Sequence, residues 1–293
     1  MSKYLEPKLG TEKHFLIVGS GIIAETLATT LLADCNKVTM VTNQLQTKSQ
    51  TFGDSNLKIL TREAFLDNST RIDSIEVAII AARPERWKAA DHLLQVVTRL
   101  THLSLGHVIL LSSSAVYGDS TNPFSETSTP EPLTDYGKSR LYIEEILSTS
   151  YPAEKLAILR LSNIYGSQNL RSLIEEITKC IKGDLAVELR LDPHALRDYL
   201  HIQDLISGLS FCVSQKTVGC FNLSTGKGVS VEELASLISE RFAYSLSTKR
   251  ISSSSIFPTA VILDNTKFRV TSGWSPADPF PAILDYIELS LGR

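Results

Sequence analysis

A glycine-rich turn near the amino terminus has the residue types and spacing to hold a phosphate group. It follows the apolar run His14–Val18 and reads Gly19-Ser20-Gly21-Ile22-Ile23-Ala24 before a helical stretch. This is the G-x-G-x-x-G/A pattern of dinucleotide-binding turns, in which the first glycine permits the turn and the second admits the pyrophosphate. The helix amino terminus offers N–H groups and partial positive charge to the anion. We predict a dinucleotide site here, although an ordinary strand-to-helix turn has the same composition. The predicted contacts are Gly19, Ser20, Gly21, Ile22 and Ile23.

The second predicted strand ends without the acidic residue that commonly binds the adenosine ribose of NAD. It covers residues 38–42 and is followed by Asn43. Without a carboxylate a ribose 2′-phosphate is not repelled, and Thr42, Asn43 or Lys48 offers it a hydrogen bond. We therefore expect NADP slightly ahead of NAD, while binding of Asn43 to the 2′-hydroxyl of NAD is nearly as good an interpretation.

Short apolar strands alternate with longer helical stretches in the first half of the chain. This pattern is typical of βαβ units and of a parallel sheet covered on both faces. The predicted strands cover residues 14–18, 38–42, 57–60, 76–82, 107–112 and 156–161, and the predicted helices cover 22–33, 84–103 and 134–150.

The alternation becomes less regular after residue 166. Helices are predicted at 170–181, 204–213, 231–242 and 282–291, with a strand at 186–191. We interpret the fold class as α/β, a Rossmann-type doubly wound parallel sheet with a smaller C-terminal α/β substrate lobe. The dinucleotide-binding domain is predicted over residues 1–168, with 197–225 returning to it, and the substrate lobe over 169–293.

Composition and charge exclude several classes of function. The 293 residues are 43% hydrophobic and 21% charged, which is ordinary globular usage rather than that of a disordered chain. The 29 basic and 32 acidic residues give a net charge of −3, so no broad positive field favours nucleic acid or an anionic membrane. Any anionic ligand is therefore expected to bind a few placed groups.

Cysteine and histidine spacing gives no support for a metal site or a disulfide scaffold. The four cysteines form no CxxC pair and are expected to be buried free thiols, and the six histidines lack ligand spacing. The first 14 residues contain no apolar signal core, and no run approaches the roughly 18 apolar residues of a spanning helix. We expect a cytoplasmic protein without a metal.

A serine-rich strand end and a tyrosine-containing helix start carry a family resemblance. The first reads Ser112-Ser113-Ser114-Ala115-Val116-Tyr117-Gly118 and the second Tyr136-Gly137-Lys138-Ser139-Arg140. The chain here resembles the extended short-chain dehydrogenase/reductase family, in its nucleotide-sugar-modifying NAD-dependent epimerase/dehydratase branch. The resemblance implies that Ser113 and Tyr136 are catalytic. Three consecutive serines leave Ser112 and Ser114 as alternatives to Ser113.

These residue types suit hydride transfer at a carbinol or ketone, which needs a proton exchanged at the oxygen. A tyrosine phenol performs this near neutral pH when a nearby positive charge lowers its pKa. Arg140 stands four residues after Tyr136, on the same helical face, where the family has lysine. We hypothesise that Arg140 supplies the charge and a hydrogen bond to the nicotinamide ribose, although it cannot join a proton relay. Lys138 points to another face and is expected to be solvated.

Further family segments follow in order. Asn163 lies in a Leu-Arg-x-x-Asn-x-Tyr-Gly segment, and Arg197 begins an Arg-Asp-x-x-His-x-x-Asp segment. The resemblance implies that Asn163, Arg197, Ser113 and Ser114 contact the substrate, with Arg197 on its diphosphate. A surface salt bridge to Asp198 or Asp204 is the alternative for Arg197. The end of the fourth strand adds expected cofactor contacts at Ala81, Ala82 and Arg83.

The resemblance implies an NAD(P)-dependent enzyme of polysaccharide biosynthesis that acts on a nucleotide-linked sugar as a homodimer. Our leading hypothesis is reduction of a 4-keto-6-deoxy nucleotide sugar, with Tyr136 as acid/base. The alternatives are a 4-epimerase with tightly bound NAD and, because of Arg140, a catalytically silent dinucleotide-binding protein. Dehydration is disfavoured because Ser114-Ala115 stands where dehydratases of the family carry an acidic pair.

Overall fold

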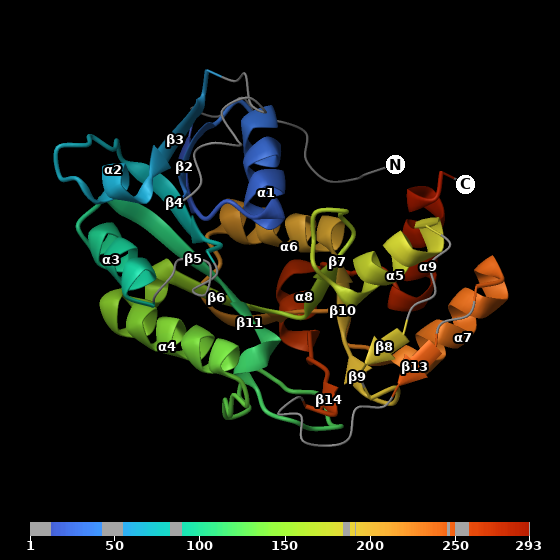
Figure 1. The fold of residues 1–293 in the computed structure, drawn as a ribbon. Helices are drawn as coiled ribbons and strands as arrows, with labels where there is room; N and C mark the ends of the chain where they lie inside the picture. The colour runs from blue at the N-terminus through green and yellow to red at the C-terminus, as the bar shows by residue number, and fades with distance from the viewer. Residues whose placement is uncertain are drawn as a thin grey trace. The chain divides into compact units, whose positions relative to one another are not determined.

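The computed structural model describes residues 13–42, 55–82, 90–183, 188–190, 192–244, 247–249 and 258–292. The chain divides into two compact units, residues 1–110 with 150–156 and residues 111–149 with 157–293. Figure 1 shows the course of the chain.

The described part of the first unit contains five strands, the last of which continues into the second unit. Its elements are β1 (His14–Val18), α1 (Ile22–Ala33), β2 (Lys37–Thr42), β3 (Leu57–Thr61), α2 (Arg62–Leu66), β4 (Ile75–Ile80), α3 (Ala90–Thr101) and β5 (Leu105–Ser113). The elements that follow are α4 (Asp135–Ser150), β6 (Leu156–Leu161), β7 (Asn163–Tyr165), α5 (Leu173–Gly183), β8 (Glu188–Arg190), β9 (Leu196–Arg197), β10 (Tyr199–His201), α6 (Ile202–Gln215), β11 (Gly219–Leu223), β12 (Val229–Ser230), α7 (Val231–Phe242), β13 (Ser247–Lys249), β14 (Ala260–Val261), α8 (Thr266–Ser272) and α9 (Pro279–Ser290).

Seven strands form one sheet in the order β11-β6-β5-β4-β1-β2-β3. Pairing is parallel where β1 meets β2 and β4, where β2 meets β3, where β4 meets β5 and where β11 meets β6. The order reverses beside β1, because β2 and β3 lie on one side of it and the later strands on the other. This is the doubly wound Rossmann arrangement, so the predicted fold class is confirmed.

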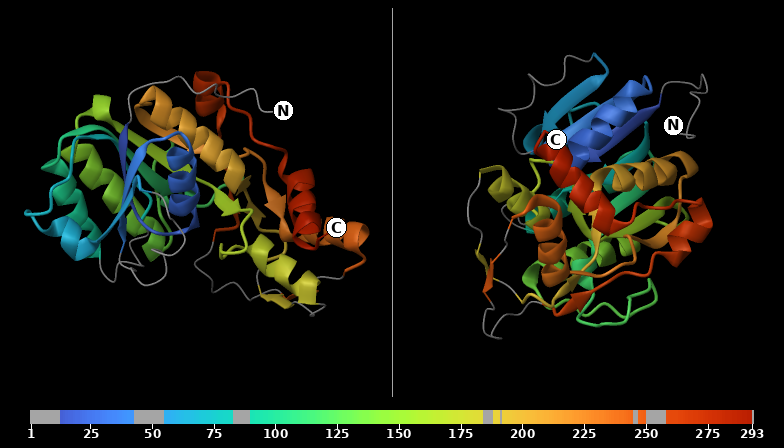
Figure 2. Two further views of the ribbon diagram at one scale, coloured as in Figure 1. Left: turned by 90° about the horizontal axis from the view of Figure 1, so that it is seen from above. Right: turned by 90° about the vertical axis from the view of Figure 1, so that its right-hand side faces the viewer.

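Helices cover both faces of the strands in the first unit. Figures 1 and 2 show α1 on one face and α2 and α3 on the other. Helix α1 buries Ala24, Leu27, Ala28 and Leu31, which lie on one helical face at i, i+3, i+4 and i+7. With both faces covered, the strands tolerate continuous apolar runs, and Phe15–Val18 is buried throughout.

The glycine turn lies at the reversal of the strand order, next to the end of β4. Ala81 N donates to Val18 O at 2.8 Å, which joins the two strand ends. Gly19 has a φ of +131°, and a Cβ there would lie 3.0 Å from the backbone of Ala81 and Ala82. Conformation and space therefore both require glycine at position 19, whereas a Cβ on Gly21 would meet no atom within 4 Å.

The second unit builds a further core from its carboxyl-terminal half. Helix α9 packs against α5, α7 and β10, and Figure 1 shows the three helices in the same part of this unit. Tyr165, Ile177, Tyr199, Ile238 and Ile283 are among the buried residues of this core. A capping box between Ser230 and Glu233 starts α7, and Asp278 caps α9.

The predicted elements agree with the structure to within a few residues over most of the described chain. Helix α1 and strands β1 and β6 have the predicted bounds, while α3 is described only from Ala90. The sequence did not predict α2, α8, the five-residue sheet strand β11 or most of the two- and three-residue strands, because each is short and carries little periodic pattern. None of the described helices is long and apolar enough to cross a membrane.

Gly19→Ala and Gly21→Ala should show that the turn requires glycine at position 19 and has room for a side chain at position 21. We expect Gly19→Ala to lower the free energy of unfolding by about 2 kcal/mol, because its φ and its neighbours both oppose a Cβ. Gly21→Ala should change it by less than about 0.5 kcal/mol. Urea unfolding of the two variants measures this, and equal losses would contradict the assignment.

Candidate active site

The first turn leads into the amino terminus of α1. Gly21 is the N-cap residue and has no side chain that could accept a hydrogen bond from the first N–H groups of the helix. These donors and the helix dipole favour an anion at this end. Because a Cβ on Gly21 would point into open space, an anion can approach the backbone closely. The turn thus has the form that a pyrophosphate requires, and its residues stay predicted cofactor contacts.

The other expected cofactor contacts of the first unit are only partly described. Thr42 is 1% exposed at the end of β2, so its side chain is buried in this structure. Ala82 is buried and Ala81 is half-buried beside Gly19. Asn43, Lys48 and Arg83 lie outside the described residues.

The three serines at the end of β5 differ in their surroundings. The Ser112 hydroxyl donates to the buried carboxylate of Glu144, and Ser114 is buried. Ser113 is half-buried, and its Oγ accepts from Ala115 N at 3.2 Å at the start of a 3₁₀ turn over Ser114–Val116. An accepting hydroxyl retains its own hydrogen for another acceptor. This arrangement favours Ser113 over its neighbours as a donor to a substrate oxygen.

Tyr136 and Arg140 are in direct contact on the first turns of α4. Arg140 Nε donates to Tyr136 Oη at 3.1 Å, and Arg140 Nη1 donates to the carbonyl of Leu111 at 3.2 Å. The Arg140 side chain is buried, whereas Tyr136 is half-buried. Lys138 is exposed and forms a 3.6 Å ion pair with Asp135, so its expected solvated position is confirmed. The positive charge beside the tyrosine therefore comes from the arginine.

Gly137 allows α4 to approach the strand end closely. A Cβ at this position would lie 2.0 Å from the carbonyl oxygen of Ala115 and 2.9 Å from Pro132 Cβ. No side chain fits in that space, so the helix start and the serine turn are in contact through backbone. This contact positions Tyr136 with respect to β5.

Asn163 begins β7 and Arg197 ends β9, two short strands of the second unit that belong to different small sheets. Asn163 donates from its backbone N and from Nδ2 to the carbonyl of Asp198, both at 3.0 Å. Arg197 donates to the carbonyl oxygens of Leu196 at 2.9 Å and of Pro258 at 2.7 Å. Arg197, the residue expected to bind the substrate diphosphate, thus donates its hydrogen bonds to backbone carbonyls in this structure.

The carboxylates proposed as salt-bridge partners of Arg197 are engaged elsewhere. Asp198 is fully buried and accepts from Thr225 N, Thr225 Oγ1 and Gly226 N at 2.8–2.9 Å. Burial raises the pKa of Asp198, and burial lowers the pKa of Arg197. Within the described chain no salt bridge joins Arg197 to Asp198 or Asp204, so that alternative is wrong here.

The sequence matches the model of the NAD dependent epimerase/dehydratase family over residues 15–223. The chain belongs to this family. The predicted family resemblance is thereby confirmed, and the family is named for NAD, whereas the sequence analysis placed NADP slightly ahead of NAD.

Known relatives of this epimerase/dehydratase family member share part of their length with it. It is 28% identical over 195 residues to the bifunctional UDP-glucose 4-epimerase and UDP-xylose 4-epimerase 3 of Arabidopsis thaliana, covering 57% of this chain and 56% of the relative. It is 27% identical over 168 residues to GDP-6-deoxy-D-talose 4-dehydrogenase of Aggregatibacter actinomycetemcomitans, covering 55% of each. The matched region thus spans little more than half of these relatives.

Solved structures of the same fold cover nearly the whole family member. The Thermus thermophilus UDP-glucose 4-epimerase complex with NAD has a TM-score of 0.80 at 17% identity, covering 96% of this chain and 99% of the other. The Bordetella bronchiseptica enzyme WbmG in complex with NAD has a TM-score of 0.81 at 19% identity, covering 96% of each chain. At these identities the likeness supports the fold.

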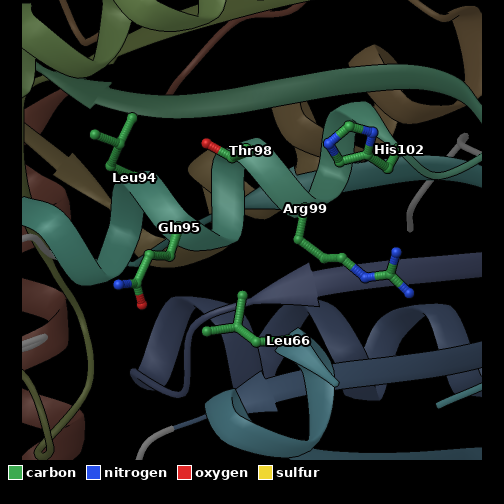
Figure 3. Close-up of a pocket in the computed structure, with 6 residues that line it drawn as sticks. All are labelled: Leu66, Leu94, Gln95, Thr98, Arg99 and His102. Carbon is green, nitrogen blue, oxygen red and sulfur yellow. The ribbon is translucent and has the colours of Figure 1, made fainter. Parts of the chain in front are cut away.

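A pocket and the cysteines of the family member lie outside the predicted site residues. Figure 3 shows a pocket between α2 and α3 lined by residues such as Leu66, Arg99 and His102, none of which was a predicted site residue. Among the described residues no three His, Cys, Asp or Glu side chains gather as metal ligands. All four cysteines are free, but only Cys212 is buried as expected, because Cys180 and Cys220 are half-buried and Cys35 is exposed.

Sequence reasoning missed a buried polar cluster that borders the serine turn. Glu144 and Arg160 form an ion pair with an N–O distance of 2.7 Å, and Arg160 Nη1 donates to Tyr117 Oη at 3.0 Å. Tyr117 Oη also lies 2.9 Å from Asn222 Oδ1. The available signal was Glu144 itself, which stands two turns after Tyr136 on the same face of α4.

Gly137→Ala should displace the first turn of α4 from the serine turn. We expect a loss of about 2 kcal/mol in the free energy of unfolding, because the new Cβ overlaps the Ala115 carbonyl. Lys138→Ala, an exposed neighbour on the same helix, serves as the control and should have little effect. If urea unfolding gives the same stability for both variants, the close approach is not a constraint.

Proposed function

We propose that this family member catalyses NAD(P)-dependent oxidation and reduction at a ring carbon of a nucleotide-linked sugar. The leading form is reduction of a 4-keto-6-deoxy nucleotide sugar, with Tyr136 as the acid. The contact of the buried Arg140 guanidinium with Tyr136 Oη is the observation that carries the proposal. A permanent positive charge beside a half-buried phenol favours a role for Tyr136 in proton exchange over a role in packing alone.

Each residue has a separate task in this proposal. When bound, the nicotinamide cofactor supplies or accepts the hydride. Tyr136 donates a proton to the sugar oxygen as negative charge develops there, and the Ser113 hydroxyl donates a hydrogen bond to the same oxygen. Arg140 stabilises the phenolate that remains on Tyr136.

Return of the proton to Tyr136 must follow a route that does not use Arg140. A guanidinium does not deprotonate in proteins, so Arg140 holds charge without passing a proton. Tyr136 is half-exposed in its unit. Water is therefore the proton source that this proposal assigns to Tyr136.

The residues of the first turn fit a dinucleotide. Gly19, Ser20, Gly21, Ile22 and Ile23 would hold the pyrophosphate, because the N-cap residue Gly21 has no side chain over the start of α1 and leaves the approach open. The described end of β2 carries Thr42 and no carboxylate, so NADP binding is included in the proposal. Comparing the dissociation constants of NADPH and NADH measures that preference.

A 4-epimerase with tightly held NAD is the second candidate. The Arabidopsis thaliana relative is named a 4-epimerase for two UDP-sugars. The Aggregatibacter actinomycetemcomitans relative is named a 4-dehydrogenase of a GDP-6-deoxy sugar and supports the leading form. A silent dinucleotide-binding protein is the third candidate, because Arg140 replaces the family lysine. The proposal also includes substrate contacts through Ser113, Ser114, Asn163 and Arg197, and a lobe boundary near residue 168. It further includes a homodimer and a cytoplasmic role in polysaccharide biosynthesis. All of these points rest on the sequence.

A panel of 4-keto and 4-hydroxy nucleotide sugars tests the proposal, with NADPH, NADH or no added cofactor. Stoichiometric loss of reduced cofactor supports the reductase, and sugar interconversion without net loss supports the epimerase. Tyr136→Phe should lower kcat by about 100- to 10,000-fold, because it removes the proton. Tyr142→Phe changes an exposed tyrosine of the same helix and should retain wild-type turnover. Cofactor binding without turnover across the panel would contradict both enzyme hypotheses.

Arg140→Lys and Arg140→Met should show whether turnover depends on a positive charge beside Tyr136 or on the guanidinium itself. We expect Arg140→Lys to retain turnover within about tenfold, because it retains a cation. Arg140→Met should lower kcat by about 100-fold, because the phenolate loses its stabilising charge. Steady-state kinetics at saturating cofactor measures both. A large gain in the lysine variant together with an unchanged rate in the methionine variant would overturn the role given to Arg140.

A further inference from the structure

Glu144 joins helix α4 to two strands through one buried carboxylate. It accepts from Ser112 Oγ on β5 and from Arg160 on β6, whose Nη2 lies 2.7 Å and whose Nε lies 3.2 Å from its oxygens. The Glu144 and Arg160 side chains are 5% and 8% exposed. Water therefore contributes little to satisfying either charge, and the geometry of the pair depends on these hydrogen bonds.

The Glu144–Arg160 pair holds both ends of the segment that carries Ser113. Glu144 binds the hydroxyl of Ser112, the residue before Ser113. Arg160 donates to Tyr117 Oη, just after the 3₁₀ turn, and its Cζ lies 4.9 Å from the centre of the Tyr117 ring. The short segment between these two attachments has little freedom to move.

Tyr117, to which Arg160 donates, is itself hydrogen-bonded to a further residue and stays in one protonation state. Burial raises the pKa of Tyr117, so its phenol stays neutral and donates to Asn222 Oδ1. Burial by itself lowers the pKa of Arg160, but its hydrogen bonds and the charge of Glu144 raise it overall. Arg160 therefore stays a cation, and the attachment persists across the working pH range.

The same helix carries the other two candidate catalytic residues. Arg140 lies one turn before Glu144 and donates to Leu111 O, while Tyr136 lies one turn earlier still. Two bonds thus fix α4 along the last residues of β5, at Leu111 and at Ser112.

We propose that the Glu144–Arg160 pair is a positioning device that sets the place of the Ser113 hydroxyl relative to Tyr136. This inference rests on the proposed function, whose acid/base chemistry needs both groups at one oxygen.

Stability alone does not account for an ion pair at this place. A buried pair of charges loses its hydration, and well-packed apolar residues of similar volume are often as stable or more so. Hydrogen bonds with fixed directions instead define the separation of the groups they join. A displacement of about 1 Å in a reacting group can cost about 100-fold in rate, so this separation matters for turnover.

A charge-neutral double variant, Glu144→Met with Arg160→Met, tests the proposal. It removes both attachments without leaving a lone buried charge, so we expect the melting temperature to stay close to that of the wild type. We expect kcat to fall by about 100-fold, with the KM of the nucleotide sugar nearly unchanged. Ser112→Ala removes the β5 attachment alone and should give a smaller loss of kcat.

Glu145→Met is the matched control, since Glu145 is an exposed neighbour on the same helix. It should retain wild-type kcat and KM. Wild-type kcat in the double variant would overturn the proposal, as would a loss of kcat in Ser112→Ala equal to that in Glu145→Met.

Amide hydrogen exchange tests the same inference without a substrate. Residues 111–117 should exchange faster in the double variant and in Ser112→Ala than in Glu145→Met. Unchanged exchange of this segment would overturn the positioning role. If the wild type turns over no sugar in the panel while this segment exchanges faster in the variants, the proposed function fails and the positioning of Ser113 stands.

Discussion

The close approach of α4 to the end of β5 is the constraint on which the candidate site of the second unit depends. Gly137 leaves no side chain between the helix and the Ala115 carbonyl. At this distance, Arg140 reaches the Leu111 carbonyl and Glu144 reaches the Ser112 hydroxyl. Any larger residue at position 137 would separate the helix from the strand and weaken both bonds.

Arginine in place of lysine fits this close packing. The Arg140 guanidinium uses Nε for Tyr136 and Nη1 for a strand carbonyl, which is a two-point contact that a single ammonium group makes less readily. The planar fork therefore fixes the phenol as well as charging its surroundings. Unlike a lysine, the Arg140 side chain cannot transfer a proton, and water therefore supplies the proton in our proposal.

Much of the fold and part of the site followed from local patterns. Helix α1 was predicted because its buried residues recur at helical spacing, and the parallel sheet because apolar strands alternate with helices. The two-residue strands β9 and β14 escaped prediction, because their pairing depends on partners distant in sequence. Arg197 shows the same limit, since its guanidinium meets the carbonyl of Pro258, 61 residues away.

The sequence by itself determined the groups that are close along the chain. Gly19 with its turn, and Tyr136 with Arg140 at a spacing of four, follow from backbone conformation and helical periodicity. Only the tertiary structure showed that the Ser112 hydroxyl hydrogen is used within the protein, whereas Ser113 Oγ accepts from Ala115 N. Ser112 is bound by Glu144, 32 residues away, and Glu144 by Arg160 on another strand. Such contacts depend on strand order and on burial, and no local spacing encodes either.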